Sequence, residues 1–440
     1  MAKKYDLVIV GAGPAGAMAA KTAGENGLNV ALLERRTNIE KITRPCGEGL
    51  TCHKYSNGEH VRVNFRDNRI VYPYNGFSIK YDGPLKGVFK YDQYSADGHI
   101  MEMKLYVGER KGDRETLPSH FAIDKEQLIN GLLDEARKNS VEIFPGVNVS
   151  GAERTDEGVI ITGNGESFEG TYAIAADGLN SRMARELGFN KKRKFLGTLR
   201  LKGWRMRGID LPDPQSHIHI VEGVDAPPMF CFLPMAKSDE YYVSIAGWTP
   251  SIDFDARLNQ VMKDSLFSSW FKKAEILRAN GCILNLLTPI IEPFKDNVLL
   301  IGDAAGFAQI SNHNAILCGW KAANTITVAL INRTLGKEGI SGYLEWWNKN
   351  FYSSVDIRPI DPTETLTREE INFYFSLFEE PLPAALSAED MRRVMGEAMA
   401  KIMPKLQAQR PDIMAKMSKL REMPPEETWA ERRKAGFPNK

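Results

Sequence analysis

Three short apolar runs stand out along this chain, because each leads directly into a turn that contains glycine. They lie at 7–10, 172–176 and 298–301, and the turns after them are followed by helix-like spacing. This pattern predicts buried strands that feed helices. Residues 55–118 and 195–250 instead alternate polar and apolar positions between turn signals, which predicts antiparallel β structure.

Helical spacing dominates elsewhere. Residues 119–150 are predicted to form a helix and then a strand, residues 254–280 an amphipathic helix, and the chain after Gly319 mostly helices. Pro404 and Pro411 are expected to divide the last part into short helices.

A methionine stripe marks this last part. It is typical of helix packing, although an adaptable wall for an apolar ligand or a peripheral membrane contact is also open. Nearby cations would suit anionic lipid headgroups or simple solubility. The methionines are Met391, Met395, Met399 and Met403, and the cations Lys405, Arg410, Lys416, Lys419 and Arg421.

The first apolar run continues as GAGPAG and a helix of small residues. Gly11 would make the tight turn, Gly13 would let a pyrophosphate approach the backbone, and Gly16 would let the helix pack closely on the sheet. Pro14 and Ala15 open the helix, whose N-terminal N–H groups attract phosphate. Glu34 ends the next strand, 23 residues after Gly11, where a carboxylate would hold a ribose, with Arg35 beside it. The segment predicts a dinucleotide site.

Two later motifs indicate which dinucleotide. Residues 172–185 run from a strand into Asp177 and Gly178, and residues 297–307 run from a strand into Gly302 and Asp303. Together with the first segment, they resemble the three motifs of FAD enzymes of the aromatic-hydroxylase and geranylgeranyl-reductase type. The expected cofactor is FAD, with the Asp303 carboxylate on a ribityl hydroxyl.

The fold class expected from these patterns is α/β. A Rossmann-like FAD-binding domain would be assembled from discontinuous segments (1–54, 119–194 and 283–335). An antiparallel β-sheet domain for substrate would be inserted between them (55–118 and 195–282), and residues 336–440 would form a helical C-terminal region.

Composition restricts the function. The 440 residues carry a formal net charge of +1, which gives no electrostatic footprint for nucleic acid. Five scattered cysteines without CxxC pairs argue against a disulfide framework, a zinc site or an iron–sulfur cluster. The N-terminus is no secretory signal and no apolar run is long enough to span a membrane. We therefore expect a cytoplasmic protein, at most peripheral to a membrane.

Residues 43–50 narrow the resemblance. Their sequence, TRPCGEGL, is similar to the basic-Pro-Cys-Gly segment of the geranylgeranyl reductase family. The resemblance implies that Cys46 and Gly47 lie beside the flavin ring, at the pocket where isoprenoid double bonds are reduced. The family also carries a Y-x-W-x-F-P motif that lines its substrate cavity. Here the matching stretch is MFCFLP, which offers Cys231, Phe232 and Pro234 as candidate pocket residues.

Two further departures from the family lie at 125 and at 311–315. Lys125 stands where an arginine is usual, and SNHNA at 311–315 replaces a glycine-rich turn that receives the pyrimidine end of the flavin. Backbone N–H groups at this helix start, with Ala315 and Ile316, would still stabilise an anionic flavin. His313 would tune the flavin or restrict the approach to it.

Candidate chemistry centres on the same loop. Cys46 could protonate the carbon opposite the hydride, or it could be a small buried hydrophobe. Glu48 is a rival proton donor, and Arg44 is a phosphate or flavin partner or an ordinary surface arginine. Among the remaining histidines, only His217 and His219 have a spacing that would suit a metal ion. They lie on one face of a strand and are interpreted as structural.

Three hypotheses follow. The first is an FAD-dependent reductase that saturates carbon–carbon double bonds of a hydrophobic, isoprenoid or polyprenyl-type lipid. The alternatives are a flavin-dependent monooxygenase of a small or aromatic substrate and a single-flavin electron carrier. Because no second dinucleotide fingerprint is present, NAD(P)H would bind transiently or a ferredoxin-like protein would reduce the flavin.

Overall fold

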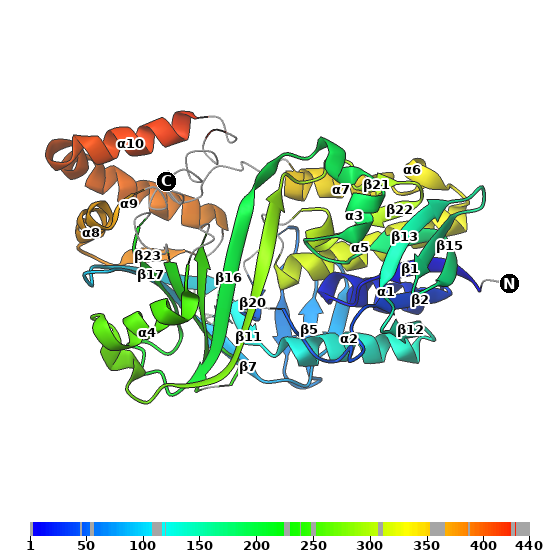
Figure 1. Ribbon diagram of the computed structural model, residues 1–440, viewed down its shortest axis with the longest axis horizontal. Coiled ribbons are helices and arrows are strands. Elements are labelled where there is room, and N and C mark those ends of the chain that lie inside the picture. The colour runs from blue at the N-terminus through cyan, green and yellow to red at the C-terminus, as the bar shows by residue number, and fades with distance from the viewer. Residues whose placement is uncertain are drawn as a thin grey trace.

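The computed structural model describes residues 3–44, 46–52, 57–107, 117–118, 120–223, 229–237, 239–247, 252–306, 311–352, 366–385, 388–423 and 427. His53, Pro45 and the tail after 427 lie outside these ranges. Within them, two large sheets divide the molecule, and helices cover each of them (Figure 1).

The first sheet is built from segments far apart in the chain. Its parallel part has the order β12-β2-β1-β15-β22, and β14, β13 and β21 extend it in antiparallel fashion. Its strands are β1 (Lys4–Val10), β2 (Val30–Glu34), β12 (Glu142–Pro145), β13 (Val149–Arg154), β14 (Val159–Gly163), β15 (Glu166–Ala175), β21 (Phe294–Lys295) and β22 (Val298–Leu300). All three predicted strand-to-turn motifs therefore end at one edge of this sheet.

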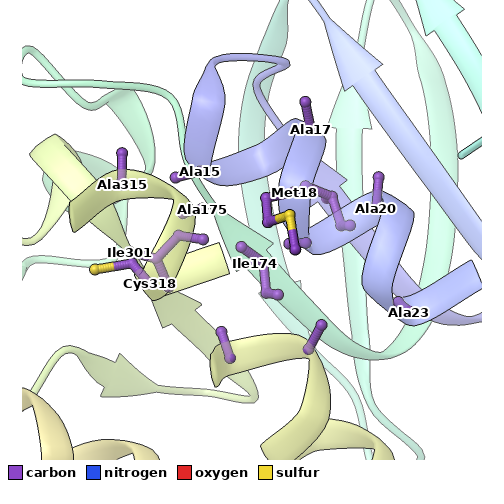
Figure 2. Close-up of a cluster of buried hydrophobic side chains, with 14 of the residues drawn as sticks. Ala15, Ala17, Met18, Ala20, Ala23, Ile174, Ala175, Ile301, Ala315 and Cys318 are labelled. Carbon is purple, nitrogen blue, oxygen red and sulfur yellow. The ribbon is translucent and has the colours of Figure 1, made fainter. Parts of the chain in front are cut away.

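Small residues bring two helices together over this sheet. Helix α1 (Pro14–Glu25) packs on α5 (Asn312–Asn332), and a Cβ atom at Gly319 of α5 would lie 2.2 Å from the Ala15 carbonyl oxygen. Met18 and the alanines at 15, 17, 20 and 23 of α1 belong to the same buried cluster as Ile174, Ile301 and Cys318 (Figure 2). Nearby lie α2 (Lys125–Lys138), α3 (Arg182–Glu186), α6 (Gly336–Gly339) and α7 (Ser341–Trp347).

The second sheet has nine strands in the order β10-β9-β8-β17-β18-β19-β16-β20, with β23 added to β9. The long strands β16 and β20 run through the middle of the molecule (Figure 1). The strands are β8 (Lys90–Ser95), β9 (Ile100–Val107), β10 (Leu117–Pro118), β16 (Phe195–Arg207), β17 (Ser216–Val221), β18 (Met229–Pro234), β19 (Glu240–Gly247), β20 (Glu275–Leu287) and β23 (Leu382–Ala385).

Two small sheets complete the β structure. One joins β3 (Gly49–Thr51), β11 (His120–Ile123) and β7 (Leu85–Val88), and the other joins β4 (Arg62–Asn64), β5 (Arg69–Tyr72) and β6 (Phe77–Lys80). The antiparallel β structure predicted for 55–118 and 195–250 is present in the described residues, and the mixed α/β class is confirmed.

Two predictions about helices are wrong. The expected helix over 254–280 ends early: α4 is Phe254–Asp264, and β20 begins at Glu275 because its residues pair along β16. Strand β20 also runs through the domain boundary predicted at 282/283. In addition, Pro404 does not break the last helices, since α9 (Ala388–Gln409) continues through it, whereas Pro411 does open α10 (Pro411–Glu422).

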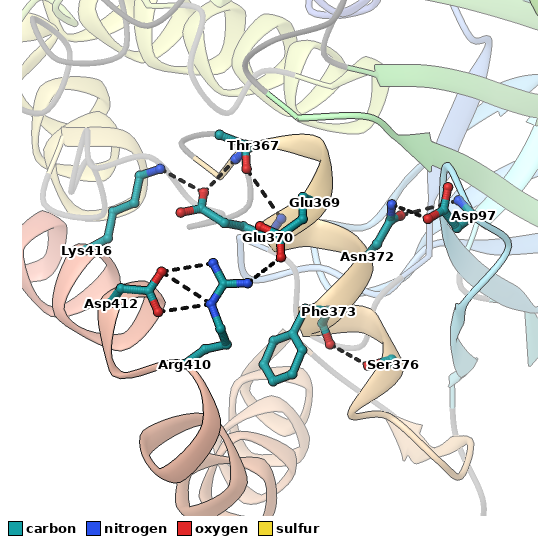
Figure 3. A network of polar contacts seen from close by, with 10 residues as sticks. All are labelled: Asp97, Thr367, Glu369, Glu370, Asn372, Phe373, Ser376, Arg410, Asp412 and Lys416. Carbon is teal, nitrogen blue, oxygen red and sulfur yellow. Dashed lines mark hydrogen bonds and ion pairs between the residues drawn. The ribbon is translucent and has the colours of Figure 1, made fainter.

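Ile402, Leu406, Ile413 and Met417 of the C-terminal helices pack on α8 (Arg368–Ser376), whereas Val394 and Ala398 of α9 pack with β9 and β23. Val394, Ala398, Ile402 and Leu406 are buried, while Met395, Met399 and Met403 lie half-buried beside them. Arg410 pairs with Glu369 at 2.6 Å and Lys416 with Glu370 at 2.8 Å (Figure 3). Lys405 pairs with Glu379 at 2.5 Å, so three of the cations considered for lipid headgroups are already paired, although such pairs near the surface contribute little to stability.

Candidate active site

In the GAGPAG turn, two glycines lie in close backbone contacts that exclude any side chain, and a third borders free space. Gly11 has φ of +100°, and a Cβ there would lie 2.5 Å from the Ala176 carbonyl oxygen. A Cβ at Gly16 would lie 1.8 Å from the Gly11 carbonyl oxygen. In contrast, a Cβ at Gly13 would meet no atom within 4 Å. The turn thus keeps free space at Gly13, where the pyrophosphate was expected, which fits FAD.

Glu34 is buried at the end of β2 and braces this turn. Its carboxylate accepts hydrogen bonds from the Ala12 N–H at 2.8 Å and from the Arg36 N–H at 2.9 Å. Burial alone would raise the pKa of Glu34, but the hydrogen bonds from Arg36 and Ala12 outweigh it and lower that pKa. Arg36, which the sequence interpretation overlooked, holds the carboxylate, whereas Arg35 is exposed. The ribose role of Glu34 and the cofactor role of Arg35 stay predictions.

In the second motif, Asp177 forms hydrogen bonds within the turn that follows it. Asp177 accepts hydrogen bonds from the Ser181 hydroxyl at 2.6 Å and the Met183 N–H at 3.1 Å, and thereby caps the start of α3. Burial raises the pKa of Asp177. Gly178 has φ of +84°. The Asp177 carboxylate therefore has a structural role that is sufficient to explain it.

The third motif meets the TRPCGEGL loop. Arg44 Nη1 lies 3.0 Å from the Asp303 carboxylate, and the same nitrogen would be 3.7 Å from a Cβ on Gly178. Gly302 has φ of +59°, which lets the chain turn sharply beside Ala15. Burial raises the pKa of Asp303, and the charge of Arg44 counteracts this. Arg44, Gly178 and Asp303 thus converge, as a common role at the cofactor requires.

This convergence gives a prediction for Asp303. We expect the variant Asp303→Ala to fold but to bind FAD about 10- to 150-fold more weakly, since a hydrogen bond to a charged group contributes about 1.5–3 kcal/mol. Titration of the apoprotein with FAD, followed by flavin fluorescence, measures the change. A dissociation constant equal to that of the wild type would remove Asp303 from the cofactor site.

Cys46 is held by three nitrogen atoms. Its sulfur lies 3.4 Å from Lys125 Nζ, 3.4 Å from the Glu48 N–H and 3.9 Å from Asn312 Nδ2. Asn312 also donates to the Gly49 carbonyl oxygen at 2.9 Å. Lys125 begins α2 and Asn312 begins α5, so two helix starts fix one thiol. The sequence signal for Lys125 was its departure from the family's arginine, and Asn312 gave no signal.

Glu48, the rival proton donor, turns away from the thiol toward α2. Its carboxylate accepts from the Lys125 N–H at 3.2 Å, and burial raises its pKa. The residue has φ of +52°, an uncommon conformation for a side chain with a Cβ. This carboxyl stays a candidate acid, but its hydrogen bond serves to anchor the loop.

A polar pocket of about 540 Å³, open mouth included, adjoins Cys46. Tyr242, Met235 and Ile42 contribute to its walls. The charged side chains that line it are Arg44, Glu48, Asp124, Glu126, Arg205 and Arg278. Several are paired, for example Arg205 with Glu240. An apolar isoprenoid chain would not fill this pocket favourably, because it would take water from the charged side chains without giving them new partners.

His313 does not face this group of residues. Its ring is 1% exposed and stacks on Tyr72, with the ring centres 5.7 Å apart. The catalytic role predicted for His313 therefore has no support in this geometry, since a substrate could not reach the ring without repacking the core.

The helix start at α5 also differs from the expectation. The Ala315 N–H donates to the Ser311 carbonyl oxygen at 2.8 Å, and Ile316 lies one position further into the helix. Because these N–H groups are used inside the helix, Asn312 and His313 carry the first N–H groups without an intrahelical acceptor. The cofactor contact predicted for Ala315 and Ile316 is better placed at those two positions.

The three residues predicted to line a substrate pocket do not share a face of β18. Phe232 is fully buried against Trp270 and Phe271 behind the sheet, and Pro234 follows on the same side. Cys231 lies on the opposite face with Leu233. A Cβ on Gly47 would be 2.8 Å from Leu233, so this second face meets the Cys46 loop. The prediction that all three line one cavity is wrong, and Cys231 alone stays a candidate.

Comparison with known proteins identifies the family. Residues 4–309 match the FAD binding domain family, which is more than half of the 440 residues. The chain therefore belongs to this family, and the predicted cofactor FAD and class, a flavin-dependent oxidoreductase, are confirmed.

Curated relatives agree in length. The chain is 25% identical over 433 residues to digeranylgeranylglycerophospholipid reductase 2 of Methanopyrus kandleri, covering 93% of this chain and 98% of the relative. It is 24% identical over 387 residues to digeranylgeranylglycerophospholipid reductase of Methanococcus vannielii, covering 84% and 89%. The resemblance to geranylgeranyl reductases inferred from the motifs is thereby confirmed.

Solved structures share the fold. A geranylgeranyl bacteriochlorophyll reductase-like protein from Thermoplasma acidophilum superposes with a TM-score of 0.69 at 17% identity, covering 96% of this chain and all of that one. The p-nitrophenol 4-monooxygenase of Pseudomonas putida gives a TM-score of 0.60 at 16% identity, covering 95% of this chain and 99% of that one. Among the described residues, no helix is both long and apolar enough to cross a bilayer.

Proposed function

We propose that this protein is an FAD-dependent reductase that saturates carbon–carbon double bonds of an isoprenoid lipid. The observation that carries the proposal is the Cys46 thiol, which Lys125 and Asn312 hold where the TRPCGEGL loop meets Leu233 of β18. Relatives named as reductases of digeranylgeranylglycerophospholipid support it.

In this proposal FAD, when bound and reduced, supplies a hydride to one alkene carbon. The residues that would hold FAD are Gly13, Glu34, Arg44 and Asp303. Cys46 would give its Sγ proton to the other alkene carbon, so the substrate gains two hydrogen atoms. Lys125 Nζ, 3.4 Å from the sulfur, would stabilise the thiolate that remains and return a proton to it.

Anaerobic incubation of the reduced holoenzyme with a geranylgeranylated lipid tests the proposal. The expected product is heavier than the substrate by two hydrogen atoms for each double bond reduced, and the flavin becomes oxidised in equal amount. If mass spectrometry finds only unchanged lipid with every prenylated compound offered, the proposal fails.

The charged pocket beside Cys46 favours a second candidate, a monooxygenase that acts on a small polar substrate. This reaction needs oxygen, whereas alkene reduction does not. Mixing the reduced enzyme with oxygen and a polar aromatic compound would give a C4a-peroxyflavin absorbance and an oxygenated product if this candidate is right. Oxidation without either result supports the reductase.

Lys125 gives a further prediction. We expect Lys125→Met to retain FAD but to lower kcat for lipid reduction about 10- to 150-fold, since it removes a charged hydrogen bond of about 1.5–3 kcal/mol. Lys125→Arg should restore most of the rate. Lys138→Met, at the exposed end of the same helix, is the matched control and should behave like the wild type. Equal rates for all three variants would show that Lys125 does not act on Cys46.

A further inference from the structure

The two faces of the nine-stranded sheet differ in chemistry. On the face toward α4, Ile218, Phe232 and Val243 are fully buried in an apolar cluster. On the opposite face, alternation along the central strands places side chains that are polar and mostly half-buried. These are Tyr91, Gln93, His217, His219, Cys231 and Ser244.

Strand register brings these side chains into adjacent positions. His217 pairs with Tyr91 and His219 with Gln93 along β8, and His219 also pairs with Cys231 along β18. They lie on the face that Leu233 shares, which contacts Gly47.

His120 connects this face to the Cys46 loop. Its ring centre is 6.1 Å from that of His217, and its Cδ2 would lie 3.5 Å from a Cβ on Gly49. The polar side chains therefore flank the loop on the side away from the charged pocket, whose residues Tyr242, Arg205 and Arg278 lie on β19, β16 and β20.

A directed chain of hydrogen bonds links four of these residues. The Gln93 amide donates to the Tyr91 oxygen at 2.7 Å, which leaves the Tyr91 hydroxyl hydrogen for His219 Nδ1, also at 2.7 Å. His219 Nε2 then carries the proton and donates to His217 Nε2 at 2.9 Å. In neutral His217 the remaining proton is on Nδ1. That nitrogen has no hydrogen-bond partner among the described residues.

The charge of the two imidazoles is set by their surroundings. Burial lowers the pKa of His219 to about 4 and that of His217 well below its usual value, with His219 contributing to the latter. At neutral pH this series of hydrogen bonds therefore carries no charge, and it ends in the N–H donor of His217. Both residues are half-buried by accessible surface. Within the described parts of the chain, no group of histidine, cysteine or acidic residues is arranged to hold a metal ion.

We propose that His217 Nδ1 binds an uncharged oxygen atom of the substrate, the hydroxyl or carbonyl of a prenylated head, and that His219 and Tyr91 orient His217 for this contact. The inference rests on the proposed reductase function. It specifies a neutral oxygen because the two uncharged imidazoles supply no positive charge to offset the water that an anion would lose on binding. Arg205 and Arg278 lie on β16 and β20, on the other side of Leu233 in the strand order. The histidine pair that the sequence indicated to be structural thus acquires a role in recognition.

The test uses reduced holoenzyme and three probes without oxygen in the buffer. Geranylgeraniol carries a hydroxyl, geranylgeranyl diphosphate carries an anion, and squalene carries no oxygen. We expect His217→Phe to raise KM for geranylgeraniol about 3- to 10-fold, the effect of one neutral hydrogen bond, with kcat and the KM for squalene little changed. His99→Phe, at an exposed histidine in the turn between β8 and β9 of the same sheet, is the matched control.

Tyr91→Phe separates recognition from packing. It removes one oxygen atom that does not touch the substrate, so it should raise KM for geranylgeraniol in the same direction by a smaller factor. Equal KM changes for geranylgeraniol and squalene, or a change for the diphosphate alone, would overturn the inference and leave the reductase intact.

Binding of geranylgeraniol to oxidised holoenzyme, followed by flavin fluorescence, tests the inference even where no probe is reduced. A dissociation constant that His217→Phe leaves unchanged refutes the contact. Failure of all probes to reoxidise the flavin would instead refute the proposed function.

Discussion

Replacing Gly13 by valine is expected to give a folded protein that no longer retains FAD. Gly13 has φ of −73° and ψ of −179°, a conformation open to any residue, and an added side chain would meet no protein atom within 4 Å. The fold should therefore tolerate valine, while its methyl groups would fill the space needed by a pyrophosphate. We expect FAD affinity to fall at least about 100-fold, which corresponds to about 2.8 kcal/mol.

Two other glycines serve as controls for this variant. Gly396→Val adds the same side chain to an exposed position of α9 that is equally open, and should retain FAD. Gly16→Val places a side chain against the Gly11 carbonyl oxygen and should prevent folding. Thermal unfolding of each apoprotein and the flavin absorbance of each purified protein distinguish the three cases. A yellow Gly13→Val protein with one FAD per chain would show that the fingerprint does not hold the pyrophosphate.

Replacing Cys46 should leave FAD content intact and slow only the oxidation of reduced flavin by the alkene. Loss of a general acid costs about 10²–10⁴-fold in rate, whereas loss of packing alone costs far less. We expect Cys46→Ala to fall in this range. Cys46→Ser keeps the size of the side chain but replaces the thiol by a much weaker acid, so its rate should fall almost as far. Single-turnover stopped-flow measurements without oxygen would determine both rates.

The outcome for Cys46 separates chemistry from shape. If serine restores the rate that alanine loses, the position matters for the shape of the loop rather than for a proton. If neither variant differs from the wild type, Cys46 is only a loop residue, and the monooxygenase or electron-carrier hypothesis becomes the better one.

The cofactor fold was largely predictable, because its strands and turns depend on local sequence. Gly11 and Gly16 have geometric roles that their spacing indicates, and the strands before Asp177 and Asp303 end at one sheet edge. The prediction of a helix over 254–280 was wrong because tertiary contacts override the local spacing: pairing with β16 makes the chain a strand from Glu275 onward.

The site was less predictable, because its parts meet only after folding. Lys125 and Asn312 begin helices 187 positions apart, as their residue numbers 125 and 312 show, yet both contact the Cys46 sulfur. Phe232 was assigned to the pocket by comparison with a family motif. Side chains alternate along a strand, and this alternation places Phe232 on the opposite face of the sheet from Cys231. His313 was a reasonable candidate by position, but Tyr72 covers its ring.

The most direct test of the central claim is the anaerobic oxidation of stoichiometrically reduced enzyme by a geranylgeranylated lipid. The proposal predicts that the oxidised flavin absorbance returns with one equivalent of alkene reduced per flavin, and that Cys46→Ala slows this return at unchanged FAD content. It would be contradicted if the flavin stayed reduced with every prenylated lipid and was oxidised only by oxygen or by a protein acceptor.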